Sequence, residues 1–118
     1  EYILNAKRGG QYGITWTLNG RAYPDVEPIT LKAKVFQKIR FTNESARLHP
    51  MHLHGQFFKV VARNGKAVNE PYWRDTVLIH PREQVDVALV PLDTGEWANH
   101  CHILEHAEAG MLTVVNVE

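Results

Sequence analysis

The chain has 118 residues, of which 44% are hydrophobic, and its 13 Lys and Arg residues balance its 13 Asp and Glu residues. This length favours a single domain with a hydrophobic core, and the zero formal charge excludes the strongly basic surface of a nucleic-acid binder or a polybasic membrane anchor. No apolar run is long enough to span a bilayer, and residues 1–10 lack the hydrophobic segment of a signal peptide.

The hydrophobic pattern predicts short β-strands along the whole chain. The expected strands are, in chain order, residues 13–20, 33–43, 56–66, 75–80, 83–91, 95–101 and 111–117. An Asn-Gly turn signal at Asn19-Gly20 closes the first strand. A second one, at Asn64-Gly65 near the end of the third strand, favours a hairpin. A single turn of helix is expected only within residues 103–109. This spacing of strands, with Gly and Pro between them, predicts a β-sandwich or barrel. Residues 1–10 and 114–118 look like the places where the domain joins another part.

The seven histidines and the single cysteine are unevenly placed, because six of the histidines fall within residues 49–54 and 100–106. In a strand, residues i and i+2 point to one face and the residue between them points to the other. His100 and His102 therefore share a face that is opposite to Cys101, and His52 and His54 have the same spacing. The pattern predicts four imidazoles on one face of a sheet and a thiol in a different site on the other face.

The thiol is expected to have a ligand set of its own. His49, His106 and Met111 remain once the two His-x-His pairs are set aside. A thiolate, two imidazoles and a weak thioether are the set used by blue-copper electron-transfer centres. Pro50 biases His49 toward an extended conformation, and Gly110 allows a tight turn before Met111.

Other uses of these residues are weaker. A structural zinc site usually takes four strong ligands, whereas this chain has too many histidines for one such site and a thioether is a poor zinc ligand. A Cys-His nucleophile is disfavoured because His100 and His102 point away from the thiol and no Gly-rich oxyanion loop is nearby. His80 is expected to be a surface histidine. Asp75 is either a buried acceptor for neighbouring donors or part of a proton or substrate path, and the structural role is favoured.

These motifs resemble those of the multicopper oxidases, the laccase-like family, and specifically their C-terminal cupredoxin domain. HPMHLHGQFF at residues 49–58 resembles the family's His-Pro-x-His-x-His stretch, and HCHILEHAEAGM at residues 100–111 resembles its closing His-Cys-His-x3-His-x4-Met stretch. Residues 16–32 and 74–83 are similar to two further family stretches. The resemblance covers nearly the whole chain and implies that residues 1–118 form a single cupredoxin domain, an all-β Greek-key β-sandwich.

By position, the resemblance assigns ligands to two copper sites. The type 1 (blue) copper would be held by His49, Cys101 and His106, with Met111 as the axial ligand. The type 2 copper would be served by His52, and the type 3 pair by His54, His100 and His102. The family's three-copper cluster takes eight histidines, four of them from another cupredoxin domain, so this chain implies half of that cluster.

The resemblance further implies an oxidoreductase of the laccase type. Type 1 copper would accept electrons from a phenolic or metal-ion reductant and pass them through the His-Cys-His segment to the type 2/type 3 cluster, where O2 is reduced to water. The expected partner is an N-terminal cupredoxin domain of a parent oxidase or an identical subunit, with copper or adventitious zinc bridging the two. The isolated domain is expected to be weak or inactive as an enzyme unless it is oligomeric. A periplasmic or extracellular location follows from the same resemblance.

Two other functions stay open, a stand-alone blue-copper electron carrier and a protein similar to copper nitrite reductase, whose type 2 copper lies between subunits. Histidines on both sides of Cys101 favour the oxidase, because the reductase needs only one there. A purely structural metal-binding module is a more distant alternative.

Overall fold

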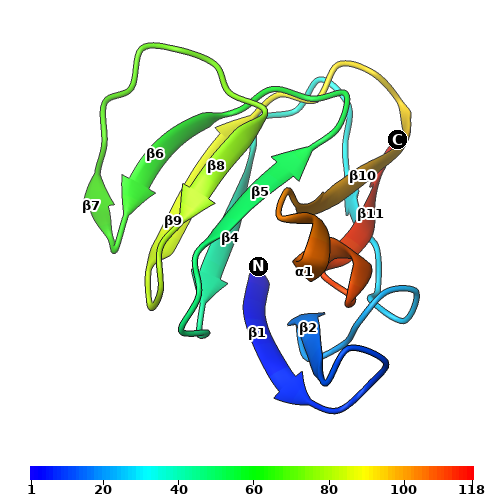
Figure 1. Ribbon diagram of the computed structural model, residues 1–118. Coiled ribbons are helices and arrows are strands. Elements are labelled where there is room, and N and C mark those ends of the chain that lie inside the picture. The colour runs from blue at the N-terminus through cyan, green and yellow to red at the C-terminus, as the bar shows by residue number, and fades with distance from the viewer.

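The computed structural model describes residues 1–118 as two packed β-sheets with one short helix (Figure 1). The elements are β1 (Tyr2–Arg8), β2 (Ile14–Leu18), β3 (Ile29–Leu31), β4 (Gln37–Asn43), β5 (His49–Leu53), β6 (Lys59–Arg63), β7 (Lys66–Ala67), β8 (Thr76–Ile79), β9 (Gln84–Leu89), β10 (Gly95–Cys101), α1 (Leu104–Glu108) and β11 (Leu112–Val117). A six-stranded sheet has the order β2-β1-β4-β9-β6-β7, and a five-stranded sheet has the order β3-β11-β10-β5-β8.

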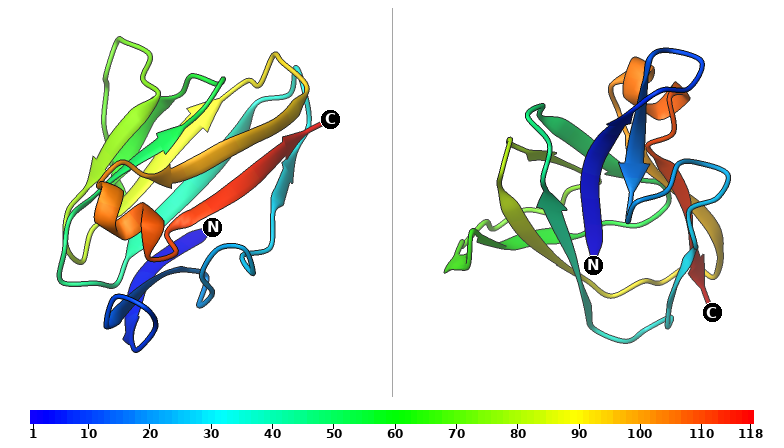
Figure 2. Two further views of the ribbon diagram at one scale, coloured as in Figure 1. Left: turned by 45° about the vertical axis from the view of Figure 1, so that its right-hand side comes forward. Right: turned by 90° about the horizontal axis from the view of Figure 1, so that it is seen from below.

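The chain crosses repeatedly between the two sheets (Figure 2). The connections from β4 to β5, from β5 to β6, from β8 to β9 and from β9 to β10 each join one sheet to the other. Most neighbouring strands are antiparallel, but β1 runs parallel to β4, and β3 runs parallel to β11. The all-β Greek-key β-sandwich expected from the sequence is confirmed.

The core lies between the sheets and is built from the alternate residues of each strand that face inward. In β4, Ile39 and Phe41 are buried, whereas the residues next to them are exposed or half-buried. In β9, Val85 and Val87 are fully buried. Burying each such side chain contributes about 1.5–3 kcal/mol. The core cluster of 21 buried residues includes Cys101, so the thiol belongs to the interior of the sandwich.

The second Asn-Gly pair forms the hairpin that the sequence predicted. Asn64 has a φ of 51° and Gly65 a φ of 78°, the left-handed conformations that a two-residue hairpin turn requires. The turn pairs Arg63 with Lys66 and so joins β6 to β7.

The observed strands differ from the expected ones at two places. Residues 2–8, for which no strand was expected, form β1 inside the six-stranded sheet, with Tyr2 and Leu4 fully buried. The strand expected at residues 33–43 begins only at Gln37, because Lys34 has a φ of 64° and turns the chain. At the other end of the chain, residues 112–117 also belong to a sheet as β11.

The helix α1 lies where a single turn of helix was expected, between β10 and β11. It contains five residues, Leu104–Glu108, and its N-cap residue Ile103 makes no capping hydrogen bond with its side chain. Such a short helix is stabilised by its packing against β10 and β2 rather than by its own propensity. No helix of the protein has the length and hydrophobicity needed to cross a membrane.

Candidate metal centre

Strands β5 and β10 lie side by side in the five-stranded sheet, and these strands together with the residue that follows each carry most of the candidate ligands (Figure 1). Their register pairs His52 with His100 and Met51 with Cys101. Because side chains alternate between faces, Cys101 points into the core and is fully buried, whereas His52 and His100 lie on the outer face and are half-buried. The predicted separation of the thiol from the His-x-His pairs is confirmed.

On the inner side, the ligand atoms of three residues converge: His49, Cys101 and His106, here called the buried cluster. Sγ of Cys101 lies 3.7 Å from Nδ1 of His49 and 3.5 Å from Nδ1 of His106. The two nitrogens are 3.1 Å apart. His49 begins β5, Cys101 ends β10 and His106 lies in α1, so the cluster joins two adjacent strands to the helix that follows them.

Met111 lies next to the buried cluster. Its side chain is fully buried. The Cys101 backbone N–H donates to the Met111 carbonyl at 3.1 Å, and the Met111 backbone N–H donates to the His106 carbonyl at 3.0 Å. These two hydrogen bonds close the loop that connects the thiol to the second imidazole and hold Met111 against both residues.

A short chain of hydrogen bonds orients His49. In the tautomer that leaves Nδ1 free, Nε2–H of His49 donates to Oγ of Ser45 at 2.8 Å. The Ser45 hydroxyl donates in turn to Oδ1 of Asn43 at 2.7 Å, and Nδ2 of Asn43 donates to the Arg47 carbonyl at 2.7 Å. This arrangement leaves Nδ1 unprotonated and turns its lone pair toward Cys101. A metal-binding imidazole needs such a free lone pair.

Burial sets the protonation state of the buried cluster. Burial, and to a smaller extent the nearby His106, lowers the pKa of His49 to about 4. Burial also lowers the pKa of His106, an effect opposed by Glu105. Burial raises the pKa of the Cys101 thiol to about 11, against a backbone hydrogen bond that lowers it. At neutral pH the metal-free cluster therefore has neutral imidazoles and a protonated thiol, and a metal that binds must displace the thiol proton.

The donor set fits copper better than zinc. A trigonal ion with bonds of about 2.0 Å to nitrogen and about 2.3 Å to sulfur needs donor separations of about 3.5 Å between nitrogens and about 3.7 Å between nitrogen and sulfur. The observed separations of 3.1, 3.5 and 3.7 Å come within a few tenths of an ångström of these values. The cluster contains no fourth strong donor, which a closed zinc tetrahedron requires.

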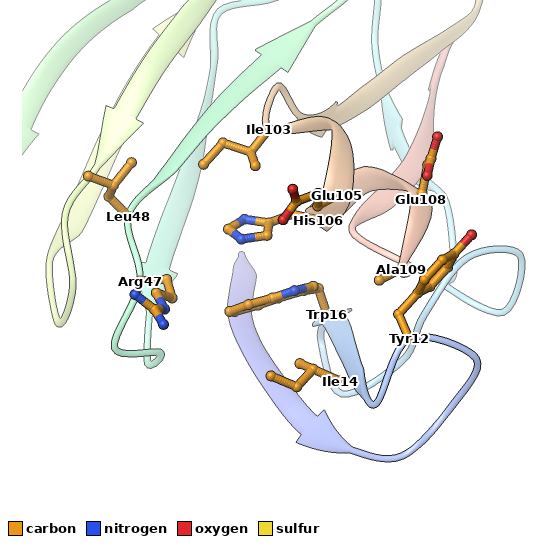
Figure 3. A pocket seen from close by; sticks show the side chains of 10 residues that line it. All are labelled: Tyr12, Ile14, Trp16, Arg47, Leu48, Ile103, Glu105, His106, Glu108 and Ala109. Carbon is orange, nitrogen blue, oxygen red and sulfur yellow. The ribbon is translucent and has the colours of Figure 1, made fainter.

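A surface cavity of about 540 Å³ opens beside His106 (Figure 3). Its lining includes Trp16, Ile103 and the exposed Tyr12, together with two glutamates and one arginine. His49 and Cys101 are fully buried, whereas His106 is half-buried and lines the cavity. His106 is therefore the residue of the buried cluster that a molecule from solution can reach.

The outer side of β5 and β10 carries a second group of imidazoles, here called the four-histidine face: His52, His54, His100 and His102. Neighbouring ring centroids are 4.5 Å apart for His52 and His54, 5.1 Å for His54 and His100, and 6.0 Å for His100 and His102. Nε2 of His54 and Nε2 of His100 face each other at 2.9 Å. The predicted convergence is confirmed, although these ligand atoms do not form a compact group like that of the buried cluster.

Hydrogen bonds also select the tautomers on the four-histidine face. With the proton on Nδ1, His52 donates to the Asp75 carbonyl at 3.0 Å, and His100 donates to the Cys101 carbonyl at 2.9 Å. Both rings then have an unprotonated Nε2, which in His100 lies 2.9 Å from Nε2 of His54. The pKa of His54 is lowered, first by burial and then by the neighbouring imidazoles, which favours its neutral form.

Two predictions about single residues have different outcomes. His80 is exposed and pairs with Glu83, as expected of a surface histidine. The prediction that Asp75 is a buried acceptor is wrong, because Asp75 is exposed at the end of the loop before β8. Its carboxylate accepts a hydrogen bond from the Thr76 hydroxyl at 3.0 Å.

Ser45 and Trp16 are site residues that sequence reasoning did not find. Ser45 lies in a polar loop where many residues could accept a hydrogen bond, and its position four residues before His49 is the only local signal. Trp16 belongs to β2, far along the chain from both ligand motifs, and nothing in its own stretch indicates which histidines it contacts.

Comparison with known proteins shows that the chain is similar to one part of several longer proteins. Residues 2–118 match the family described as multicopper oxidase. The chain is 33% identical over 98 residues to multicopper oxidase MmcO of Mycobacterium tuberculosis, which covers 83% of this chain and 19% of that protein. It is 33% identical over 105 residues to copper resistance protein A of Escherichia coli, covering 89% of this chain and 17% of that protein. It is 35% identical over 113 residues to a laccase of Haloferax volcanii, covering 89% of this chain and 19% of that protein. The chain thus spans less than a fifth of the length of these three relatives.

The fold recurs in solved structures. The multicopper oxidase of Campylobacter jejuni, described as a metallo-oxidase, superposes with a TM-score of 0.84 at 24% identity, covering 98% of this chain and 29% of that one. The blue copper oxidase of Nitrosomonas europaea superposes with a TM-score of 0.80 at 25% identity, covering 98% of this chain and 43% of that one. These likenesses confirm the cupredoxin-like form of the sandwich.

Proposed function

The chain belongs to the multicopper oxidase family, and from this premise we propose that its buried cluster is a type 1 copper site. The ligands in this proposal are His49, Cys101 and His106, with Met111 on the axial side. The observation that carries it is the convergence of two Nδ1 atoms and one Sγ inside the sandwich. Copper bound there supplies a one-electron redox centre.

The residues around the buried cluster prepare it for this use. Ser45 holds His49 in the tautomer that directs Nδ1 inward, and burial keeps the ring neutral. The half-buried edge of His106 faces the cavity, which we propose as the binding place of a phenolic or metal-ion reductant. Electrons would therefore enter at the exposed edge of the site, while the thiol stays away from solvent.

The His-Cys-His segment joins the two faces of the sheet. Cys101 belongs to the buried cluster, whereas His100 and His102, one peptide unit away on either side, belong to the four-histidine face. We propose that this segment carries electrons from the inner face to the outer face.

The four-histidine face is proposed as half of an oxygen-reducing copper cluster, with His52 serving a type 2 copper and His54, His100 and His102 serving a type 3 pair. The other half would come from another cupredoxin domain, because this chain supplies only four imidazoles to the face. The chain also spans under a fifth of the length of the relatives described above. In this proposal residues 1–118 form one cupredoxin domain, the C-terminal one of a parent oxidase. The parent reaction takes four electrons from reductant and four protons to convert O2 into two waters. A periplasmic or extracellular location is part of the proposal and rests on family resemblance.

Identical copies are the second way in which the four-histidine face could be completed. Two copies that face each other would bring eight imidazoles together, since symmetric pairing duplicates the ligand set. Sedimentation with and without chelator tests this arrangement: the mass should fall when chelator is added and in the double variant His54→Ala, His102→Ala. An unchanged mass in both cases excludes metal-bridged copies and leaves a separate domain as the partner.

The two rival functions predict different chemistry. His100 and His102 both lie on the outer face with His52 and His54, which favours a multinuclear cluster over the single outer ligand that a nitrite reductase needs beside its cysteine. Turnover of O2 with a phenol by the parent protein separates an oxidase from an electron carrier, and turnover of nitrite separates the oxidase from the reductase.

The direct test of the type 1 site is the visible spectrum. Loading with Cu(II) should produce an intense thiolate-to-copper charge-transfer band, which Cys101→Ser should abolish and the surface variant His80→Ala should leave intact. Met111→Leu should keep the colour and raise the reduction potential, because it removes a weak axial donor. A band that survives Cys101→Ser would show that the thiol is not a ligand.

A further inference from the structure

The strand β2 lies directly against the loop that carries the second imidazole. The Trp16 backbone N–H donates to the Ala109 carbonyl at 3.0 Å, and the Tyr23 backbone N–H donates to the Gly110 carbonyl at 2.9 Å. These two hydrogen bonds attach an early segment of the chain to the end of the ligand loop, outside both histidine motifs.

The indole of Trp16 contacts both imidazoles of the buried cluster. Its ring centroid is 4.1 Å from that of His106 with the planes tilted by 35°, and 5.1 Å from that of His49 in an edge-on arrangement. Figure 3 shows the indole lying across the imidazole of His106, on the side of the cavity that β2 forms. Only 9% of Trp16 is exposed, so this large apolar surface is used almost entirely for contact with its neighbours.

The segment from β2 to Ala22 packs closely against the ligand loop at Gly110. A Cβ added at Gly110 would lie 2.7 Å from the Trp16 carbonyl oxygen and 2.5 Å from Cβ of Ala22. Gly110 also has a φ of 123°, which favours glycine. The backbone of Trp16 is therefore held against the ligand loop by close packing as well as by its hydrogen bond, and from this fixed backbone the indole packs onto the His106 ring.

We propose that Trp16 is a positioning residue of the type 1 site, which fixes the plane of the His106 ring, keeps water from that side of the buried cluster, and thereby raises the reduction potential of copper bound there. The proposal rests on the type 1 function argued above. Reduction lowers the net charge of a copper–thiolate site, and an apolar neighbour that excludes water favours the form of lower charge. Loss of the indole admits water to His106 and favours the oxidised form.

Two variants of the full chain test this role, Trp16→Ala and the conservative Trp16→Phe. In the metal-free chain, the ring current of the indole should shift the ring protons of His106 upfield in the proton NMR spectrum. This shift should disappear in Trp16→Ala and be partly retained in Trp16→Phe. In the copper-loaded chain, the reduction potential measured by redox titration should fall in Trp16→Ala and recover partly in Trp16→Phe.

Two further variants separate positioning from other effects. Tyr12 lines the same cavity but has no ring contact with either histidine, so Tyr12→Ala should weaken reductant binding, seen as a higher KM for bleaching of the blue colour, without changing the potential or the His106 resonances. Trp73 is 58% exposed and lines a different pocket, so Trp73→Ala should change none of these readouts.

The outcomes are distinguishable. An unchanged potential and unchanged His106 resonances in Trp16→Ala would overturn the proposal, as would an equal fall in potential in Trp73→Ala. If Trp16→Ala does not fold, the same comparison is made with Trp16→Phe, whose smaller ring should give an intermediate shift and potential. If the unsubstituted chain takes up no coloured copper, the type 1 function fails, whereas the NMR shift still decides whether Trp16 positions His106.

Discussion

The two faces of the β5–β10 strand pair differ in how complete they are. The buried cluster draws its ligands from two strands and a helix and is closed from solvent on most sides. The tautomer of His49 is set by hydrogen bonds to the buried residues Ser45 and Asn43. The four-histidine face draws its imidazoles from β5, β10 and the residue that follows each strand, and it is partly open. The hydrogen bonds that select the tautomers of His52 and His100 go mostly to the backbone.

This difference indicates that the inner and outer faces meet different structural requirements. A redox site that must keep one geometry is built into the core, where packing holds each ligand in place. A site that is completed by another domain has to remain on the surface until that domain covers it. The following predictions test how far the two faces behave independently.

The largest expected difference is in the pH dependence of metal uptake. The Cys101 thiol, with its pKa raised to about 11, holds a proton that the metal must displace, whereas His49, with its pKa lowered to about 4, is already neutral. Affinity at the buried cluster should therefore rise about tenfold per pH unit from pH 7 to pH 10, about 1000-fold in all. The four-histidine face contains no thiol and should change far less.

Titration with Co(II) measures this difference, because the thiolate-to-cobalt absorption reports only on the buried cluster. Cys101→Ser provides the background from the outer face. A slope near zero for the thiolate band would mean that the thiol is already ionised in the metal-free protein.

Gly110→Ala should disrupt the inner face and spare the outer one. The added Cβ would meet Ala22 and the Trp16 carbonyl at a backbone conformation with a φ of 123°, so we expect the free energy of unfolding to fall by about 3 kcal/mol. Urea unfolding measures the change. The matched control is Gly65→Ala, which has a φ of 78° but no atom within 4 Å of the added Cβ, and so should lose only about 1 kcal/mol from backbone strain. Equal losses in the two variants would mean that close packing at Gly110 is unimportant.

Acid should destabilise the metal-free chain through the inner face. The pKa of His49 is about 4 in the folded protein, and its ordinary value is 6.5. The unfolded chain therefore binds a proton more readily, and the stability present above pH 6.5 is lost as the pH falls toward 4. Between pH 7.5 and pH 4.5 this group should remove about 2.5 kcal/mol from the free energy of unfolding. Urea titrations at the two pH values measure it, and His49→Gln should flatten the dependence while His80→Ala should not.

Ser45→Ala should have the smallest of these effects. It leaves Nε2–H of His49 without its acceptor inside the protein, which should cost about 1–2 kcal/mol of unfolding free energy while the copper colour is retained. Thr76→Val is the matched change on the outer face: Nδ1 of His52 keeps the Asp75 carbonyl as an acceptor, so the loss should be a few tenths of a kcal/mol, or about 0.5 at most. A larger loss of unfolding free energy in Thr76→Val than in Ser45→Ala would mean that the hydrogen bond to the histidine contributes more stability on the outer face than in the buried cluster.

The sequence predicts the separation of the two faces because the period of a strand is two residues. Cys101 must lie opposite His100 and His102 wherever the strand sits in the sheet, and the same rule places His49 and His52 on different faces. The ligand positions are local properties of two motifs, and the fold class follows from alternating strands and Asn-Gly turns.

The residues that support the buried cluster could not be predicted in this way. Trp16 reaches His106 only because β2 packs against the ligand loop, which is a tertiary contact with no local signal. Ser45 acts through a side chain whose loop position allows many partners. The missed strand β1 has a short alternation of Tyr2 and Leu4 that is too brief to separate from a loop without its neighbours in the sheet.

The arrangement of β10 sets a limit on changes in chain length. Deletion or insertion of one residue next to Cys101 would reverse the direction of every side chain beyond that point, so that an imidazole would enter the core and a thiol would face solvent. A two-residue change would restore the direction but would shift the pairing with β5, in which His100 lies opposite His52. The turn at Asn64-Gly65 carries no ligand and joins strands at the edge of the other sheet, so extra residues should be accommodated there. Loop grafting or library design on this domain should therefore keep the length of the His-Cys-His strand fixed and vary length at the β6–β7 turn.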